Sequence, residues 1–318
     1  MGKRNICIVT GGAGFIGSHL VKELIRRGFF VYCLDNLITG NKNNIKGFLT
    51  NPSFRFVKTD VISDSLDFIK QDRIDFIYHL ASPASPPQYR KYSIETLLVN
   101  SIGTYRMLKL AKSSHSRFLL ASTSEVYGDP KEHPQKETYY GHVNPVGIRA
   151  CYDESKRFAE ALTMEYQRKF NLDIRIIRIF NTYGPNMRVD DGRVISNFIT
   201  QALSGHPLTI YGTGAQTRSF CYVSDMVEGL IAAMETKSAA NKIINMGNPV
   251  EITIRQLADL IIVLTSSKSK IVKLNSRLSD DPEKRKPDIA QAHKILKFKP
   301  KVDLQDGLKK TISYFNSL

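Results

Sequence analysis

A tyrosine and a lysine, Tyr152 and Lys156, stand four positions apart in a stretch whose pattern predicts a helix. This spacing puts both side chains on one helix face. A tyrosine with the reference pKa of about 10 is a poor base at neutral pH, but a nearby ammonium group stabilises its phenolate. The pair can therefore remove a proton from a hydroxyl group. Because the same spacing often occurs by chance, the prediction needs support from other residues.

That support comes from the segment STSEVYG at 122–128, which follows an apolar run typical of a strand. Thr123 could share a substrate hydroxyl with Tyr152. Glu125 in the same segment could serve the reaction, or it could be a helix-capping or surface acid. Arg285 lies in the charged run Lys284–Lys286, where its side chain could simply be solvated.

A glycine-rich turn, TGGAGFIG at 10–17, follows the first predicted strand and opens a helix. Gly11, Gly14 and Gly17 stand where a side chain would obstruct the turn, the pyrophosphate or helix packing, and the helix N-terminus faces the phosphates. Asp35 ends the second predicted strand, where it would accept from ribose hydroxyls and repel a 2′-phosphate. This context favours bound NAD over NADP, and over a glycine turn without a ligand.

Further cofactor neighbours are expected along the carboxyl edge of the predicted sheet, where such sheets bind ligands. Asp60 is expected to end the third strand and Ala81 the fourth. Asn100 lies in a predicted helix and could equally be structural. The full predicted cofactor set is Gly11, Gly14, Phe15, Ile16, Gly17, Asp35, Asn36, Asp60, Val61, Ala81, Asn100, Tyr152 and Lys156.

The elements that must position these residues alternate short apolar runs with longer helical patterns, which indicates a parallel sheet wrapped by helices. Helices are expected up to about Arg27, around 95–113 and from Ala150 to Phe170. The pattern predicts an α/β fold: a Rossmann-type doubly wound sheet over residues 1–180, joined by a smaller α/β substrate domain over 181–318. The chain is expected to return to the first domain at about 222–248.

The composition of the 318 residues is globular, with 42% hydrophobic and 24% charged residues. The net charge of +15 could suit nucleic acid, but the basic residues are scattered and no aromatic RNA-binding signature accompanies them. Nucleic acid is therefore not expected as a partner. The four cysteines lie far apart without CxxC spacing, so neither a metal site nor a disulfide framework is expected.

The N-terminal apolar run passes directly into the glycine turn, which leaves no room for a signal peptide, and no run has transmembrane length. A cytoplasmic location without a membrane partner is the simplest expectation. A membrane anchor removed from the sequence would leave no trace.

Several longer segments carry a resemblance to a known family, among them HLASPASPP, LLASTSEVYGDP, HVNPVGIRACYDESKR, RIFNTYGPNMR, YGTGAQTRSFCYVSD and DDPEKRKPDI. The chain resembles the extended short-chain dehydrogenases/reductases, and within them the UDP-glucuronate decarboxylases. The resemblance implies an NAD-dependent carboxy-lyase that makes UDP-xylose, with a UDP-sugar domain. Members of this family are commonly homodimers joined through helices of the first domain, so the resemblance implies the same assembly here.

The resemblance also implies roles for individual residues. Thr123, Tyr152 and Lys156 would form the redox triad, Glu125 would lie beside the sugar carboxylate, and Arg285 would serve the decarboxylation step. The implied substrate-binding residues are Pro83, Ser85, Tyr89, Ser124, Asn181, Arg193, Tyr211, Gln216 and Arg218.

Three alternatives stay open. A nucleotide-sugar 4,6-dehydratase shares the triad and the glutamate, but it needs an acid where this chain has Ser124. A 4-epimerase needs no site for a carboxylate. A Rossmann-fold RNA-binding protein without activity would have no physical need of Thr123, Tyr152 and Lys156 together.

Overall fold

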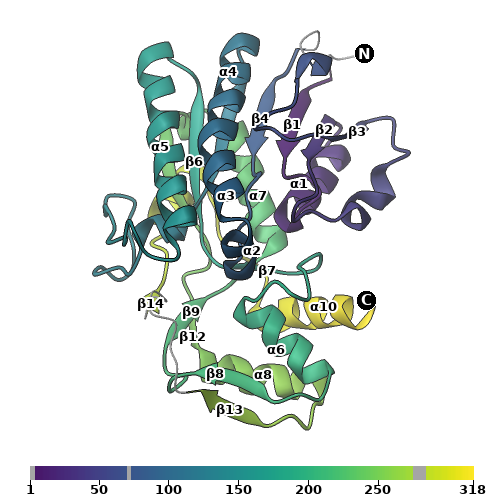
Figure 1. Ribbon diagram of the computed structural model, residues 1–318, viewed down its shortest axis with the longest axis vertical. Helices are drawn as coiled ribbons and strands as arrows, with labels where there is room; N and C mark the ends of the chain where they lie inside the picture. Colours follow the sequence, from purple (N-terminus) through teal and green to yellow (C-terminus); the bar gives the residue numbers. More distant parts are fainter. Residues whose placement is uncertain (1–3, 70–72, 275–283) are drawn as a thin grey trace.

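The computed structural model describes residues 4–69, 73–274 and 284–318 (Figure 1). Residues 280–283, which begin the DDPEKRKPDI segment, lie outside this range. Within the described residues, no helix combines the length and apolarity that a membrane span requires.

A seven-stranded sheet forms the centre of the larger unit, in the order β11-β6-β5-β4-β1-β2-β3. Each strand pairs in parallel with its neighbours. Most residues of these strands are apolar because helices cover both faces of the sheet. The predicted Rossmann-type doubly wound fold is confirmed. The bounds are β1 (Ile6–Thr10), β2 (Phe30–Asp35), β3 (Phe54–Lys58), β4 (Phe76–His79), β5 (Arg117–Thr123), β6 (Ile174–Ile179) and β11 (Lys242–Met246).

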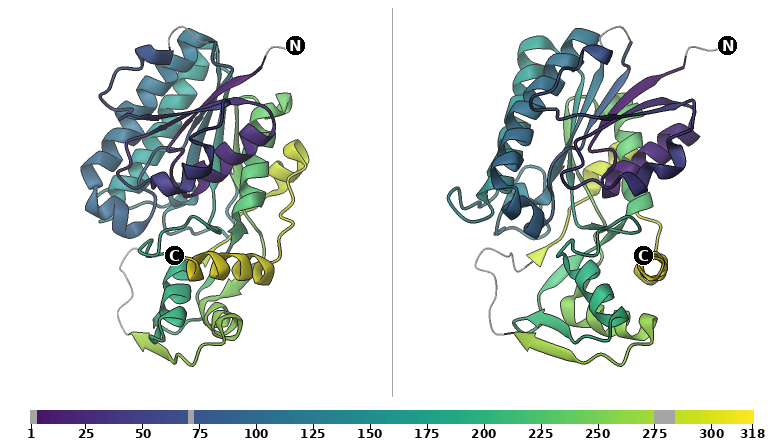
Figure 2. Two further views of the ribbon diagram at one scale, coloured as in Figure 1. Left: turned by 90° about the vertical axis from the view of Figure 1, so that its right-hand side faces the viewer. Right: turned by 45° about the vertical axis from the view of Figure 1, so that its right-hand side comes forward.

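Two helical layers enclose this sheet (Figure 2). One layer holds α1 (Phe15–Arg26), α7 (Val223–Glu235) and α9 (Ala290–Leu296). The other holds α2 (Pro86–Lys91), α3 (Ser93–Leu98), α4 (Thr104–Ser114) and α5 (Ala150–Phe170). The helix expected around 95–113 differs in detail, because a π-helical turn at Val99–Gly103 joins α3 to α4. A pattern with a period of 3.6 residues does not reveal such a turn.

A smaller α/β unit lies below the sheet in Figure 1. Its helices α6 (Val194–Leu203), α8 (Ile254–Thr265) and α10 (Leu304–Asn316) pack on one another. Two short sheets accompany them, one of β8 (Leu208–Tyr211) with β13 (Ile271–Leu274), the other of β9 (Thr217–Ser219) with β12 (Glu251–Thr253) and β14 (Lys284–Arg285). A two-stranded pair connects the units: β7 (Thr182–Tyr183) and β10 (Cys221–Tyr222), which leads into α7.

Candidate active site

A cavity of about 640 Å³ lies between the carboxyl edge of the large sheet and the smaller unit. This volume is in the range of small-molecule sites. Every predicted site residue except Asn100 lines it: Gly11, Gly14, Phe15, Ile16, Gly17, Asp35, Asn36, Asp60, Val61, Ala81, Pro83, Ser85, Tyr89, Thr123, Ser124, Glu125, Tyr152, Lys156, Asn181, Arg193, Tyr211, Gln216, Arg218 and Arg285.

The glycine turn has the close backbone approaches that a dinucleotide cradle requires. Gly11 has φ +69°, and a Cβ there would lie 2.9 Å from the amide nitrogen of Ala81. A Cβ on Gly17 would lie 2.1 Å from the carbonyl oxygen of Gly11. Side chains are therefore excluded where α1 begins, and the open backbone amides of its first turn fit a pyrophosphate.

Asp35 is buried beside this turn. Its carboxylate accepts hydrogen bonds from the backbone amides of Ala13 (2.9 Å) and Leu37 (2.8 Å). Burial raises its pKa, and these two hydrogen bonds oppose the shift. A carboxylate can accept about four hydrogen bonds, so Asp35 retains capacity for the ribose hydroxyls of NAD. The residues present therefore fit this cofactor.

Asp60 and Ala81 lie slightly beyond the strands that were expected to end at them. β3 ends at Lys58 and β4 at His79, two residues earlier in each case. Asp60 is fixed by Asn36, whose side-chain nitrogen donates to it at 3.0 Å. Both residues still reach the cavity because the chain turns along the carboxyl edge of the sheet.

Asn100 occupies the π-helical turn rather than the cavity wall. Its side-chain nitrogen donates to the hydroxyls of Ser82 (3.1 Å) and Ser155 (3.0 Å). These contacts tie the helix behind the cavity to α5 and to the loop after β4. They favour the structural alternative for Asn100, and its contact with a cofactor stays a prediction.

Tyr152 and Lys156 lie on one face of α5, as their spacing predicts, and both are buried. The Lys156 ammonium donates to the carbonyl oxygen of Ala121 at 2.9 Å. Burial raises the pKa of the Tyr152 hydroxyl, and the hydrogen bond with Thr123 opposes this shift. The Tyr152 ring stacks on Tyr89, with the ring centroids 5.1 Å apart. These contacts fix the tyrosine hydroxyl beside the end of β5.

Glu125 follows β5 and is held between two arginines. One carboxylate oxygen pairs with Arg149 at the start of α5, and the other pairs with Arg285 of β14. Burial alone would raise the pKa of Glu125, but the two guanidinium groups outweigh it and lower the pKa. Glu125 is therefore an anion held by two guanidinium groups.

The other predicted substrate residues also line the cavity. Arg193 forms a two-pronged ion pair with Asp191, and its guanidinium lies 6.0 Å from the ring centre of Phe15. Gln216 donates to the carbonyl oxygen of Tyr211 at 2.9 Å, and the Tyr211 side chain is 44% exposed. An exposed tyrosine ring and an arginine fork suit a base and a phosphate respectively.

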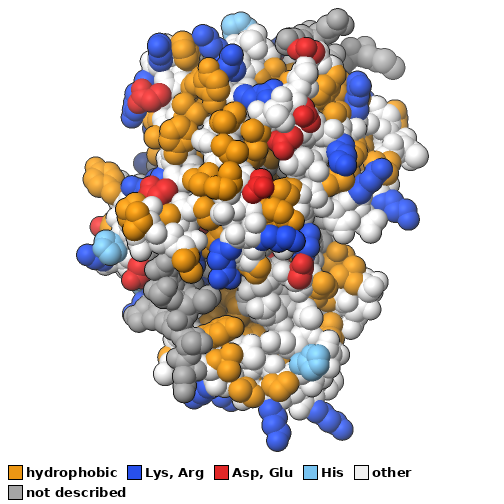
Figure 3. Space-filling model, viewed as in Figure 1, with side chains coloured by type: hydrophobic (Ala, Val, Ile, Leu, Met, Phe, Trp, Pro, Cys, Tyr) orange, Lys and Arg blue, Asp and Glu red, His pale blue; other side chains and the backbone are white. Residues whose placement is uncertain are grey.

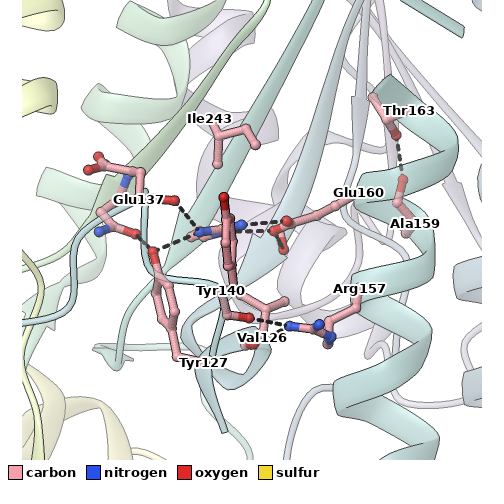
Figure 4. Close-up of polar contacts among 12 residues, drawn as sticks. Val126, Tyr127, Glu137, Tyr140, Arg157, Ala159, Glu160, Thr163 and Ile243 are labelled. Carbon is pink, nitrogen blue, oxygen red and sulfur yellow. Dashed lines mark hydrogen bonds and ion pairs between the residues drawn. The ribbon is translucent and has the colours of Figure 1, made fainter. Parts of the chain in front are cut away.

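A buried polar network, which the sequence analysis did not identify, supports the site from behind. Arg178 of β6 forms a double ion pair with Glu160 of α5 and donates to the Tyr127 hydroxyl at 2.9 Å. Glu160 also accepts from Ser122 at 2.5 Å. Figure 4 shows Glu160 and Tyr127 entering this network from opposite sides. The network joins α5 to β5 and β6 next to Lys156.

The network continues to the strand that carries Arg285. The Tyr127 hydroxyl donates to Asn245 at 2.7 Å, and Asn245 donates to the carbonyl oxygen of Gln135 at 3.0 Å. The backbone amide of Gln135 donates a hydrogen bond to the carbonyl oxygen of Lys286 at 2.9 Å. Arg285 is therefore fixed through its neighbour Lys286, and it contacts Glu125 although 160 positions separate the two residues.

Comparison with known proteins gives consistent matches over almost the whole chain. Residues 7–247 match the family described as the NAD dependent epimerase/dehydratase family. The chain is 50% identical to UDP-glucuronic acid decarboxylase 1 of Arabidopsis thaliana, over 99% of this chain and 71% of that protein. It is 51% identical to UDP-glucuronic acid decarboxylase 1 of Xenopus tropicalis, over 98% of this chain and 72% of that protein.

Solved structures with the same fold include two epimerases. UDP-glucuronic acid 4-epimerase from Bacillus cereus, in complex with UDP-glucuronic acid and NAD, is 31% identical with a TM-score of 0.89, over 98% of this chain and 99% of that chain. UDP-glucose 4-epimerase from Thermotoga maritima, with UDP-glucose, is 29% identical with the same TM-score and the same coverage.

Proposed function

This chain belongs to the NAD-dependent epimerase/dehydratase family and, within it, to the UDP-glucuronic acid decarboxylases, and on that premise we propose that it converts UDP-glucuronate into UDP-xylose and carbon dioxide. The observation that carries the proposal is the Glu125 carboxylate between Arg149 and Arg285, directly beside the Tyr152 and Thr123 side chains. A cationic cluster next to a proton-abstracting group suits a sugar that bears a carboxylate.

The residues of the site act first on carbon 4 of the sugar and then on the neighbouring carbon 5. Tyr152 removes the proton of the hydroxyl on carbon 4, with Thr123 sharing that hydroxyl and Lys156 fixed close by. Bound NAD supplies the hydride acceptor for this step and the hydride donor for the last one. The new ketone lies β to the carboxylate, so it accepts the electron pair when the bond to the carboxyl carbon breaks. Carbon dioxide leaves, and an enolate remains.

The enolate then takes a proton at carbon 5, supplied by Arg285 or by a water that Arg285 positions. Tyr152 returns its proton to the oxygen on carbon 4 as that carbon is reduced again. The sequence of steps consumes no net oxidant, because the reduction reverses the first oxidation. Glu125 would lie beside the carboxylate until carbon dioxide leaves. The same proposal includes the cofactor and substrate roles of the other cavity residues. It also includes the boundary between the two domains at residue 180.

The experiment is a proton NMR time course of the protein with UDP-glucuronate and NAD. The proposal expects UDP-xylose to appear without stoichiometric NADH. Conversion of UDP-glucuronate into its 4-epimer would support the 4-epimerase instead, and loss of water from UDP-glucose would support the 4,6-dehydratase. Tight RNA binding without turnover of any UDP-sugar would support the non-catalytic alternative.

The homodimer is a further part of this proposal. Its support is a group of exposed apolar side chains on the outer face of α3, α4 and α5: Ile94 (62% exposed), Tyr105 (45%) and Phe158 (52%). Figure 3 shows apolar side chains gathered over these helices. Contiguous apolar surface of this kind marks interaction sites on soluble domains.

A cytosolic location is likewise proposed, and cell fractionation would test it.

A further inference from the structure

The short strand β14 carries Arg285 to the cavity, and the register of this strand decides which side chain arrives there. Successive residues of a strand point to opposite faces. Arg285 is only 4% exposed and lines the cavity. Its neighbour Lys284 is exposed, the Lys286 ammonium pairs with Glu251 at 3.4 Å, and neither lysine lines the cavity. A slip of one position would turn Arg285 away from the cavity and a lysine toward it.

Gln135 holds the residue after Arg285 by both of its backbone groups. The Gln135 amide donates to the Lys286 carbonyl oxygen at 2.9 Å, and the Gln135 side-chain oxygen accepts from the Lys286 amide at 2.9 Å. The side-chain oxygen thus acts as the carbonyl group of a neighbouring strand would. Because β14 is only two residues long, its register needs support from outside its own pairing with β9. Gln135 supplies such support.

Gln135 can serve as an anchor because it is itself fixed. The residue is completely buried. Its side-chain nitrogen donates to the carbonyl oxygen of Glu132 at 2.6 Å. Its own carbonyl oxygen accepts from the Asp288 amide at 2.8 Å and from the Asn245 side chain at 3.0 Å. Every polar atom of Gln135 therefore has a partner, and satisfied buried polar groups of this kind favour one conformation.

The loop that carries Gln135 also contacts the Arg285 side chain. Gly128 begins this loop after the turn that follows β5, and its carbonyl oxygen accepts from the Arg285 guanidinium at 3.3 Å. Another nitrogen of the guanidinium pairs with Glu125. The same loop thus holds the guanidinium group of Arg285 through Gly128 and the backbone just beyond Arg285 through Gln135.

We propose that Gln135 is a positioning residue for the decarboxylation step, and that it fixes the register of β14 so that the Arg285 guanidinium lies at carbon 5 of the sugar. Gln135 does not line the cavity, so it acts through Arg285. Oxidation at carbon 4 depends on Tyr152 and Lys156 of α5 and does not need this contact. The inference rests on the proposed function and adds to it a residue that serves one of its steps.

The test measures the two chemical steps separately in the wild type and in Q135M. The NAD-loaded protein reacts with UDP-glucuronate in a single turnover. The near-ultraviolet absorbance of NADH follows the oxidation, and release of carbon dioxide from an isotope-labelled carboxyl group follows the decarboxylation. Decarboxylation should slow roughly 10- to 100-fold, because a displacement of about 1 Å at a reacting group can have an effect of this size. Oxidation should change less than about threefold, so NADH should accumulate.

Two further variants separate positioning from a loss of stability. Q135E keeps a side-chain oxygen that can accept from the Lys286 amide, so its decarboxylation should be faster than that of Q135M. Q135N keeps the amide but is one methylene shorter, so it should slow decarboxylation selectively as Q135M does. The matched control is K136M, the next position of the same loop, where the side chain is exposed. Both of its rates should equal those of the wild type.

Equal slowing of both steps in Q135M would overturn the inference, and so would an unchanged rate of decarboxylation. Should Q135M fail to fold, the same two outcomes in Q135N decide the question. Decarboxylation in Q135E as slow as in Q135M would contradict the role of the side-chain oxygen. Absence of UDP-xylose with the wild type contradicts the proposed function, whereas normal wild-type turnover without a selective effect in the variants contradicts only the role of Gln135.

Discussion

At the scale of single residues, Tyr152 and Lys156 are governed by opposing effects. Burial raises the pKa of the Tyr152 hydroxyl and lowers the pKa of Lys156 to about 7. Both shifts disfavour the charged forms that proton abstraction uses. The sequence pattern predicts an ammonium that stabilises the phenolate, and in the folded chain burial works against this effect. The positive nicotinamide ring of bound NAD would favour the phenolate.

Replacing Tyr152 by Phe removes the hydroxyl and leaves the ring that stacks on Tyr89. Turnover of UDP-glucuronate should fall at least about 100-fold, the usual contribution of a positioned acid or base. Affinities for NAD and UDP-glucuronate should stay nearly the same. NMR rates and calorimetry check the two parts, and near-normal turnover would remove Tyr152 from the role of base.

The lowered pKa of Lys156 predicts a pH-dependent stability in the cofactor-free protein. Between the folded pKa of about 7 and the ordinary value of 10.5, the unfolded lysine binds a proton that the folded one does not. The free energy of unfolding therefore rises with pH across this window, with a slope approaching about 1.4 kcal/mol per pH unit, and levels off on either side.

Urea denaturation from pH 6 to pH 10.5 measures this effect when the wild type is compared with K156M. The difference in unfolding free energy between the two proteins isolates the contribution of Lys156 from that of other titrating groups. It should shift in favour of the wild type as the pH rises through the window. A difference that stays constant with pH would contradict a buried lysine with a lowered pKa.

At the scale of elements, the ion pair of Arg178 and Glu160 locks α5 against β5 and β6. Removal of one partner leaves the other charge buried and alone, which costs about 3–5 kcal/mol. R178M should therefore lower the unfolding free energy by about that amount in urea denaturation. The control is R255A, which breaks a helix pair whose side chains are both 52% exposed and should cost less than about 1 kcal/mol. Equal losses of unfolding free energy in R178M and R255A would contradict a large stabilising contribution from the buried network.

The elements around the site follow from local sequence far better than the contacts between them do. The glycine turn, Asp35 and the pair on α5 could be predicted because each depends on neighbours within one strand and helix. The network of Glu160 and Arg178 could not, since its members come from separate strands and helices and each looks like an ordinary surface charge. Arg149 had a usable signal, its position one turn before Tyr152, but its contact with Glu125 depends on how α5 packs against the turn after β5.

At the scale of the whole molecule, the apolar face on α3, α4 and α5 predicts self-association. I94D combined with F158D places two charges on this face and should convert a dimer into monomers in sedimentation velocity experiments. The control is V263D on α8, where the side chain is 71% exposed in the smaller unit, and it should leave the assembly unchanged. A wild-type protein that sediments as a monomer would contradict the proposed dimer.

The place of β11 in the central sheet has a consequence for shortened versions of the gene. β11 pairs with β6 along its whole length, yet it comes from residues 242–246, after the chain has passed through α6, β8 and β9 of the smaller unit. A truncation at residue 180 would leave the backbone N–H and C=O groups along the edge of β6 unpaired, and such an edge is a template for aggregation. We therefore expect that residues 1–180 do not form a stable fragment on their own. During synthesis the ribosome must pass well beyond α5 and complete β11 before the central sheet can close.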